Sequence, residues 1–445
     1  MDRFDVIVIG GGIGGYTCAI RASELGKSVA LVEQREIGGT CLNRGCIPTK
    51  ALLRSAEVYE LLKNPKEFGI GAENISFDVS RMHERKDEVV SKLRGGVEFL
   101  LKKANVRVIK GKGELSADKR VMVKGDVLEA ENVVIATGSE PAQLLGTDGK
   151  NVITSDEALN LREMPETIAI VGAGPIGIEF ATYFASFGVK VKVLEMMDHV
   201  LPPLNDRKTT SLLASALKRR GIELMTGSKI ERIEKEEKVT AVLSNGDRIS
   251  ADKALISIGR KFSSSDMEAQ GIKAEKGRIV VNERMETSAA GIYAIGDVTG
   301  GLMLAHKAMH EGLVAAENIA GRTRTMDYSI IPSVVYSKPE VAWIGMTKDD
   351  AGLKGIEALV GECPFSANGK ALCEGESYGN ATVVADKNGR VTGAQIIGSQ
   401  ASVMIEEIAL AMSKGATLED LSRLVHPHPT LSEVIFEACS RALGK

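Results

Sequence analysis

The chain has 445 residues, of which 44% are hydrophobic and 26% are charged, and its formal net charge is −3. This length is typical of about three domains, and the near-neutral charge argues against nucleic acid or a membrane surface as a bulk partner. No apolar run reaches the roughly 18 residues of a transmembrane helix, and the N-terminus lacks the pattern of a secretory signal. We therefore expect a cytoplasmic protein, in which close cysteine pairs are more often metal-binding or catalytic than structural.

The first predicted element is a strand over residues 5–9, a β-branched apolar run of strand length. Gly10, Gly12 and Gly15 follow in a G-x-G-x-x-G arrangement, and a helical pattern then leads into a second strand that ends in Glu33. A strand, this glycine turn, a helix and an acid together are typical of a dinucleotide-binding unit. The second glycine lets a pyrophosphate reach the backbone, the helix N-terminus attracts its charge, and the acid accepts hydrogen bonds from ribose hydroxyls.

Two cysteines, Cys41 and Cys46, lie in the stretch GGTCLNRGCIPTK over residues 38–50. Metal binding is disfavoured because this spacing is unusual for ligands, and no second cysteine pair or histidine cluster accompanies it. A structural disulfide is disfavoured by a reducing compartment and by the short loop, which would constrain the unfolded chain little. A redox-active pair is the third possibility.

Chain geometry favours a disulfide that is easily reduced. The bond needs Cα atoms about 4.4–6.8 Å apart, whereas residues i and i+5 lie about 8–9 Å apart in a helix and about 16 Å apart in a strand. The backbone must therefore bend around residues 43–45, which Gly45 allows, and a strained disulfide is easier to reduce. Lys50, near the start of the next helical segment, is either a solvated lysine or a cation that holds negative charge on a thiolate.

The glycine unit recurs later in the chain. Gly172, Gly174 and Gly177 follow a strand and open a helix, and the next strand ends in Glu195. In each copy the acid lies 23 positions after the first glycine, and two copies predict two bound dinucleotides. Glu195 would repel a 2′-phosphate, and no arginine follows closely to receive one, so the second site should prefer NAD(H) over NADP(H).

Two further strands end in candidate ligand contacts. An apolar strand is predicted over residues 131–139, and another over residues 291–300 is followed by a helical pattern over residues 304–321. Asp297 can point at a polar ligand or act as the N-cap of that helix, and its sequence context leaves both possibilities open. Thr137 and Gly138 at the end of the first strand and Ala305 in the helical pattern are also expected cofactor contacts. Gly259, near the end of the second dinucleotide unit, is another.

The order of these segments predicts nested domains. The first dinucleotide domain would span residues 1–142 and the second residues 143–260, and a central domain over residues 261–328 would complete the first site. From residue 329 to residue 445 the pattern of strands and helices changes, which indicates a separate α+β domain.

The segment VHPHPTLSE near the C-terminus carries the remaining candidates. His426 and His428 alternate with prolines and are therefore expected on extended backbone. Histidine is suited to accept a thiol proton near neutral pH, so either one is a candidate base. Thr430 and Glu433 fit T-x-x-E, a capping box in front of an apolar helix, and this structural role competes with a catalytic one for Glu433.

These motifs resemble those of the class I pyridine-nucleotide disulfide oxidoreductases along nearly the whole chain. GGTCLNRGCIPTK matches the active-site signature of that family. The segments IPSVVYSKPEVAWIG and VHPHPTLSE, together with Glu195, match its dihydrolipoamide dehydrogenase branch better than its glutathione, trypanothione or mercuric reductases. The fold that the resemblance implies is α/β, with two Rossmann-like domains that bind FAD and NAD and a C-terminal α+β dimerisation domain.

The resemblance also implies roles for the residues of the first half of the chain. FAD would occupy the first site and NAD the second. Cys46 would face the flavin, and Cys41 would be the thiol that meets the substrate. Lys50 would lie near the flavin and pair with Glu179, and Asp297 would bond the ribityl chain.

For the C-terminal segment, the resemblance implies a homodimer in which each subunit completes the other's site. His428 would be the base that acts on the substrate of the partner subunit, Glu433 would orient it, and His426 would be structural. Pro175 within the second glycine motif and Arg44 between the cysteines depart from the more usual residues of the family. A positive charge at Arg44 could lower a thiol pKa or point to solvent.

The predicted function is that of a flavoprotein disulfide oxidoreductase. It would oxidise dihydrolipoamide, free or on a lipoyl-bearing protein, through a Cys41–Cys46 disulfide and FAD, and pass a hydride to NAD⁺. One alternative is an NAD(P)H-dependent reductase of another low-molecular-weight disulfide. A non-catalytic binding module and a flavin oxidase with an idle cysteine pair are further alternatives.

Overall fold

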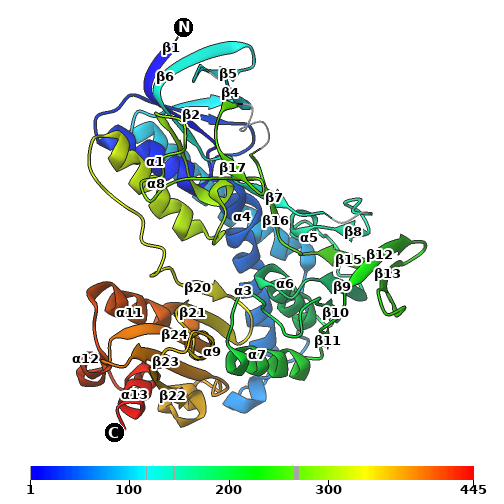
Figure 1. Cartoon of the computed structure of the whole chain (residues 1–445). Coiled ribbons are helices and arrows are strands. Elements are labelled where there is room, and N and C mark those ends of the chain that lie inside the picture. The colour runs from blue at the N-terminus through cyan, green and yellow to red at the C-terminus, as the bar shows by residue number, and fades with distance from the viewer. Residues whose placement is uncertain (1, 117, 144–145, 265–269, 445) are drawn as a thin grey trace. The chain divides into compact units, whose positions relative to one another are not determined.

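A computed structural model describes residues 2–116, 118–143, 146–264 and 270–444, in which the chain forms two compact units (Figure 1). The first unit combines Met1–Leu52, Asp78–Ala142 and Gly259–Asp327, and the second combines Leu53–Phe77, Gln143–Ile258 and Tyr328–Lys445. Both units contain sheets and helices, and the predicted α/β fold class is confirmed. The division into four domains stays a prediction.

The first unit is built on a seven-stranded sheet. Across the sheet run β3 (Arg107–Lys110), β2 (Val29–Glu33), β1 (Asp2–Ile9), β6 (Asp126–Ile135), β5 (Val121–Val123) and β4 (Gly113–Leu115), and β19 (Ile292–Ala294) also pairs with β6. The strands around β1 are parallel, and Val6, Ile7 and Val8 are fully buried because helices or other elements cover both faces. The unit also holds the pairs β7 (Ser139–Pro141) with β16 (Arg260–Phe262) and β17 (Ala274–Glu275) with β18 (Arg278–Ile279).

Two helices of this unit approach each other at glycines. They are α1 (Ile13–Glu24), which follows β1, and α8 (Ala305–Ile319), which follows β19 and the short helix η3 (Gly296–Thr299). A Cβ atom at Gly312 would lie 2.5 Å from the Gly14 carbonyl oxygen, so only glycine allows this backbone contact. The other helices that begin in this unit are α2 (Gly39–Arg44), α3 (Cys46–Lys63) and α4 (Val79–Lys103).

The second unit repeats the strand–glycine–helix arrangement on a parallel sheet. Its strands, in order across the sheet, are β11 (Glu223–Met225), β10 (Lys190–Leu194), β9 (Thr167–Val171), β15 (Lys253–Ile256) and β8 (Val152–Ile153). The helices of this part are α5 (Ser155–Ala158), α6 (Pro175–Ser186) and α7 (Arg207–Arg219), and η1 (Pro65–Phe68) follows α3. A separate antiparallel sheet contains β12 (Ile230–Lys235), β13 (Val239–Leu243) and β14 (Arg248–Ala251).

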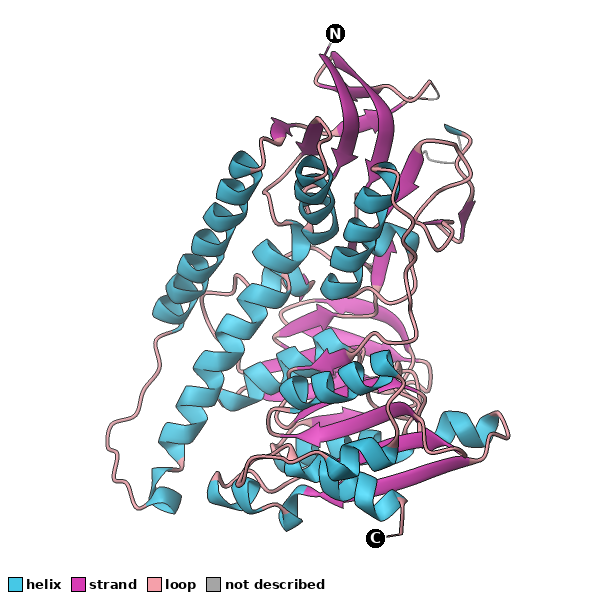
Figure 2. Cartoon of the chain, turned by 90° about the vertical axis from the view of Figure 1, so that its left-hand side faces the viewer, coloured by secondary structure: helices cyan, strands magenta, loops and turns pink. Residues whose placement is uncertain are grey.

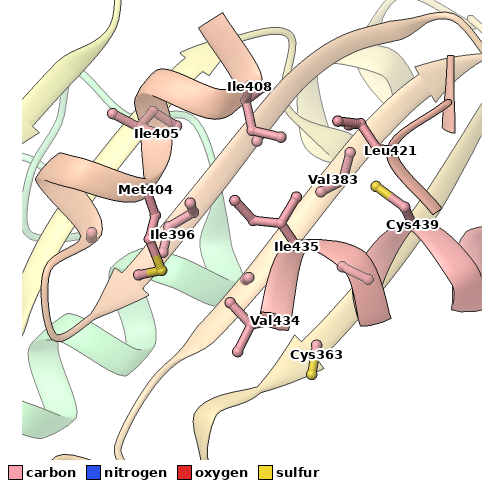
Figure 3. Close-up of a cluster of buried hydrophobic side chains, with 14 of the residues drawn as sticks. Cys363, Val383, Ile396, Met404, Ile405, Ile408, Leu421, Val434, Ile435 and Cys439 are labelled. Atoms are coloured by element: carbon pink, nitrogen blue, oxygen red, sulfur yellow. The ribbon is translucent and has the colours of Figure 1, made fainter. Parts of the chain in front are cut away.

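The C-terminal part of the second unit is an antiparallel sheet with helices, as predicted (Figure 2). The sheet order is β20 (Ser333–Val335), β21 (Glu340–Gly345), β24 (Val391–Gly398), β23 (Asn380–Asp386) and β22 (Ala358–Pro364). Val383 and Ile396 of the sheet belong to one buried cluster with Ile405 of α11 (Ala401–Lys414) and Ile435 of α13 (Glu433–Ala442) (Figure 3). The remaining helices are α9 (Lys348–Leu353), η4 (Phe365–Ala367), α10 (Gly369–Cys373) and α12 (Leu418–Arg423).

Within the described residues, no helix is both long and apolar enough to span a bilayer. The same residues contain no cluster of three or more His, Cys, Asp or Glu side chains arranged to bind a metal ion.

Candidate active site

The first glycine motif forms a turn between β1 and α1 that leaves a helix N-terminus open. Gly10 has a φ of +110°, and a Cβ atom there would lie 2.2 Å from the Ala136 carbonyl oxygen. A Cβ atom at Gly15 would lie 1.9 Å from the Gly10 carbonyl oxygen, so both positions require glycine for packing. Gly12 differs, because it is the N-cap of α1 and makes no side-chain hydrogen bond. The atom nearest to a Cβ added at Gly12 would be Cα of Gly39, 3.9 Å away. This open position suits an anionic ligand such as a pyrophosphate.

The second glycine motif has the same division of roles. Cβ atoms at Gly172 and Gly177 would lie 2.5 Å and 2.0 Å from backbone carbonyl oxygens, whereas one at Gly174 would meet nothing within 4 Å. Gly174 is the uncapped N-cap of α6, and Pro175 is at the first helical position. Proline is favoured there because its missing N–H would have no partner within the helix. Pro175 is unusual for the family, but it is compatible with the helix start that the glycine motif requires.

The acid at the end of the second strand holds the glycine turn in both copies. Glu33 accepts hydrogen bonds from the backbone N–H of Gly11 at 2.6 Å and of Arg35 at 2.6 Å. Glu195 accepts them in the same way from Ala173 at 2.7 Å and Met197 at 2.8 Å. Both carboxylates are buried, and each oxygen keeps a lone pair with which it could accept a ribose hydroxyl. The residues of both motifs thus fit a dinucleotide.

The fold brings an arginine to the segment after Glu195, where the sequence showed none close by. Arg207, at the start of α7, donates from Nη2 to Oδ2 of Asp198 at 2.7 Å. Its charge is engaged by that carboxylate, which is also 2.6 Å from Nδ1 of His199. An arginine that is distant from Glu195 in the sequence can therefore still pair with the segment that follows Glu195.

The cysteine pair lies where the backbone breaks between two helices. Gly45 separates α2 from α3 with φ −144° and ψ −113°, as the prediction of a bend at this glycine requires. A Cβ atom at Gly45 would lie 3.2 Å from Cα of Cys41, so a larger residue would crowd the pair. The thiols of Cys41 and Cys46 are hydrogen bonded to each other. They are close enough to exchange between dithiol and disulfide.

Electrostatic surroundings distinguish Cys41. The hydrogen bond with Cys46 raises the pKa of the Cys41 thiol, burial raises it further, and the charge of Lys50 acts in the opposite direction. Lys50 is half-buried near the start of α3, so it is not the fully solvated lysine of the alternative interpretation. Burial and then the charge of Cys41 raise the pKa of the Tyr16 phenol, so Tyr16 lies within electrostatic range of the pair. Sequence reasoning missed Tyr16, which lies in α1 and gives no local signal.

Arg44 has a partner other than solvent. Its guanidinium forms an ion pair with Glu36. Burial of Glu36 opposes ionisation, but the hydrogen bond and charge of Arg44 outweigh it and hold the pKa of Glu36 below its usual value. The charge of Arg44 is therefore paired with Glu36 in the preceding loop.

Asp297 lies in η3 and is held by residues of two other segments. Its Oδ2 accepts a hydrogen bond from Oγ of Ser139 at 2.5 Å and lies 3.8 Å from Nε of Arg260. The N-cap of α8 is Leu304, so the alternative role of Asp297 as the N-cap of that helix is wrong. The strand β19 ends at Ala294, and Asp297 belongs to the 3₁₀ turn that follows it.

The other predicted contacts of the first unit lie on short connections. Thr137 and Gly138 follow β6, and Oγ1 of Thr137 donates to the Ser263 carbonyl oxygen at 2.6 Å. Gly259 has a φ of +115° just before β16, and Ala305 is the first residue of α8. Their contacts with a cofactor stay predictions.

His428 and Glu433 form a dyad at the start of α13. Nδ1 of His428 lies 2.8 Å from Oε1 of Glu433, and the His428 side chain is 77% exposed. The other carboxylate oxygen, Oε2, accepts the backbone N–H of Thr430 at 2.9 Å. Only the Glu433 half of the expected capping box forms, because the N-cap of α13 is Ser432 and not Thr430. The Thr430 hydroxyl donates to the Pro427 carbonyl oxygen at 2.8 Å. One carboxylate thus serves both the helix start and the histidine.

The two remaining candidates are buried. Nε2 of His426 lies 3.0 Å from Oε1 of Glu407, and its side chain is 7% exposed, which fits the structural role expected for it. Glu179 is buried in α6 and accepts the backbone N–H of Tyr336 at 3.0 Å. Its pairing with Lys50 stays a prediction.

Two family profiles match the chain. The profile described as pyridine nucleotide-disulphide oxidoreductase matches residues 4–312, and the one described as the dimerisation domain of that family matches residues 331–439. The second match supports the predicted homodimer. Together the two profiles cover both units and confirm the predicted family.

Relatives match over their full length. A dihydrolipoyl dehydrogenase of Bacillus subtilis (strain 168) is 42% identical over 468 aligned residues, which cover 100% of this chain and 98% of that protein. A dihydrolipoyl dehydrogenase of Geobacillus stearothermophilus is 41% identical, with 99% and 96% covered.

Solved structures agree with this assignment. LpdA from Mycobacterium tuberculosis has a TM-score of 0.92 at 25% identity, with 99% of both chains covered. The HOCl-induced flavoprotein disulfide reductase RclA from Escherichia coli has a TM-score of 0.88 at 30% identity, with 98% of this chain and 99% of that chain covered. Because profiles, full-length relatives and solved structures agree, the chain belongs to the pyridine nucleotide-disulphide oxidoreductase family.

Proposed function

We propose that this chain oxidises dihydrolipoamide to lipoamide and delivers the electrons to NAD⁺. The observation that carries the proposal is the pair of hydrogen-bonded thiols, Cys41 and Cys46, at a helix break in the unit that holds the first dinucleotide motif. Relatives with the name dihydrolipoyl dehydrogenase at 42% identity supply the substrate class. FAD and NAD are the cofactors, and the two glycine motifs supply one site for each.

The reaction begins with thiol–disulfide exchange. One substrate thiol gives its proton to His428 of the partner subunit, and its sulfur attacks Sγ of Cys41. The Cys41–Cys46 bond breaks, and its electron pair leaves on Cys46 as a thiolate. The second substrate thiol then attacks the substrate sulfur of the mixed disulfide and gives its proton to Cys41. The substrate thereby loses two electrons as lipoamide, and the cysteine pair gains them. When bound, FAD would supply the redox chemistry that links this electron pair to hydride transfer to NAD⁺.

The proton acceptor is an exposed dyad whose function needs a second subunit. Nδ1 of His428 faces Glu433, so the other ring nitrogen, Nε2, is directed away from the carboxylate and can accept a proton. The side chain is 77% exposed in a single chain, as expected for a base that acts on a substrate bound to a partner. Lys50 would hold negative charge near the thiols, and Glu179 would pair with it.

The second site would favour NAD(H) over NADP(H). Glu195 places a buried carboxylate beside the glycine turn, where it would repel a 2′-phosphate. The charge of Arg207, which follows Glu195 in the chain, is engaged by Asp198. We further place the protein in the cytoplasm, with four domains bounded near residues 142, 260 and 328.

A substrate and cofactor assay tests this function. Purified holoenzyme is supplied with dihydrolipoamide or glutathione, and with NAD⁺/NADH or NADP⁺/NADPH. The proposal predicts turnover with dihydrolipoamide and NAD⁺ that exceeds every other combination by at least about 100-fold in kcat/KM. Strong preference for NADPH and another disulfide would favour the second candidate, a reductase of a low-molecular-weight disulfide. A favouring observation for that candidate is the likeness to RclA, a flavoprotein disulfide reductase.

A further inference from the structure

The turn that carries Asp297 is held by a buried ion pair on α8. The side chains of Lys307 and Glu311 are 2% and 0% exposed, and Lys307 Nζ lies 3.1 Å from Oε1 of Glu311. Lys307 Nζ also donates to the Gly300 carbonyl oxygen at 3.0 Å, and Oε2 of Glu311 accepts the Gly296 N–H at 2.7 Å. The pair therefore fixes both ends of the turn, at Gly296 and Gly300.

A second group of residues fixes the carboxylate itself. Nε of Arg260 donates to Oγ of Ser139 at 2.6 Å, and Nη2 of Arg260 donates to the Ser139 carbonyl oxygen at 2.7 Å. A guanidinium has only donors, so the Ser139 hydroxyl must accept from Arg260 and direct its own proton elsewhere. That proton goes to Oδ2 of Asp297 at 2.5 Å. The direction of the hydrogen bonds from Arg260 to Ser139 and from Ser139 to Asp297 is thus fixed.

This order makes Asp297 the last acceptor of the series. The Ser139 hydroxyl donates to Oδ2 of Asp297, and Nε of Arg260 lies 3.8 Å from the same oxygen. Among the described residues nothing donates to its second oxygen, Oδ1, so one carboxylate oxygen remains for a ligand hydroxyl. Arg260 is only 12% exposed, so its charge acts on this site with little screening by water.

We propose that Ser139 and Arg260 are positioning residues for the first dinucleotide. They orient the Asp297 carboxylate so that Oδ1 accepts a hydrogen bond from a polyol hydroxyl of FAD, while the Lys307–Glu311 pair holds the backbone of the turn. The inference rests on the proposed function in one respect, namely that FAD occupies the first site. It goes beyond that function because it assigns the positioning of Asp297 to two residues that do not themselves bear on the reacting atoms.

The test compares release of FAD from variants of the holoenzyme. Ser139→Ala removes the hydroxyl that links Arg260 to Asp297, and we expect its FAD affinity to fall about tenfold to a hundredfold, as for the loss of a hydrogen bond to a charged group. Ser186→Ala is the matched control: Oγ of Ser186 likewise accepts from an arginine, Arg220, at 3.0 Å, and donates to the Thr182 carbonyl oxygen at 2.8 Å, but in the other unit. It should retain FAD as the unmodified protein does.

A double-variant cycle separates positioning from a merely structural role. If Ser139 acts through Asp297, then Ser139→Ala should change FAD affinity by less than about threefold in a protein that already carries Asp297→Asn. Equal effects of Ser139→Ala in both backgrounds would overturn the inference, as would unchanged FAD affinity in the single variant. Should Ser139→Ala not fold, Arg260→Lys gives the same test, because a lysine nitrogen cannot reproduce both contacts with Ser139.

The outcomes also distinguish the inference from the proposed function. An unmodified protein that binds no FAD would contradict the proposed function itself. An unmodified protein that binds FAD, together with a Ser139→Ala variant that binds it equally well, would contradict only the positioning role of Ser139 and Arg260.

Discussion

Cys41 and Cys46 differ in their local surroundings although they form one pair. Cys46 is the first residue of α3, an 18-residue helix, and a helix N-terminus favours negative charge on the residue there. For Cys41, the hydrogen bond with Cys46 and burial raise the pKa instead. The position of Cys46 at the start of α3 agrees with the predicted thiolate on Cys46, and this assignment stays a prediction. The sequence could not show this asymmetry, because it depends on where α3 begins.

At Glu433 the contacts predict a pH-dependent contribution to stability. The N–H of Thr430 and then His428 hold the pKa of Glu433 below its usual value. A depressed pKa means that its contribution is present above the unfolded pKa of about 4.3 and is lost as the pH falls through the lower folded value. We expect Glu433→Gln to lower Tm at neutral pH, and the difference from the unmodified protein to shrink below about pH 4. Thermal unfolding at a series of pH values checks this, and a difference that does not depend on pH would contradict it.

At the scale of elements, the sequence predicted most of what positions the site. Both glycine turns, the acids after the second strands and the break at Gly45 are local features, and local patterns reveal them. The contact between Ser139 and Arg260 joins residues 121 positions apart, and Tyr16 comes within electrostatic range of Cys41 because α1 packs against α2. Such contacts arise from packing, so no local pattern could have shown them.

The glycine turn of the first unit yields a prediction about stability. A Cβ atom at Gly15 would lie 1.9 Å from the Gly10 carbonyl oxygen, so Gly15→Ala should destabilise the protein by at least about 1–3 kcal/mol and weaken FAD binding. Gly95 in α4 is the matched control, because it is exposed and a Cβ atom there would meet nothing within 4 Å. Gly95→Ala should stabilise by about 0.5–1 kcal/mol through helix propensity. Denaturant unfolding of both variants measures this, and equal effects of the two would refute the packing argument.

At the scale of the whole molecule, the proposed site draws on two chains. The C-terminal part matches a dimerisation domain, and it carries the exposed His428–Glu433 dyad. Sequence resemblance suggested that His428 acts across the dimer. Periodicity and spacing predicted only that His428 lies on extended backbone between prolines and that Glu433 belongs to a capping box. Subunit mixing tests this role.

Complementation between inactive subunits tests the shared site. Cys41→Ser and His428→Ala homodimers should both lose nearly all turnover with dihydrolipoamide. When the two variants are co-expressed, each mixed dimer should contain one complete site, built from Cys41 of one chain and His428 of the other. Random mixing should then restore about a quarter of the normal activity. If both residues acted within one chain, no mixed dimer would contain a complete site, and activity would stay absent.

The most direct test of the account is an anaerobic titration of the holoenzyme with dihydrolipoamide, followed by visible absorbance. The account predicts that two electrons per subunit produce a long-wavelength band from a Cys46 thiolate beside the flavin, that Cys41→Ser shows this band without substrate, and that Cys46→Ser never does. Bleaching of the flavin without such a band, or its persistence in Cys46→Ser, would contradict electron transfer through the cysteine pair.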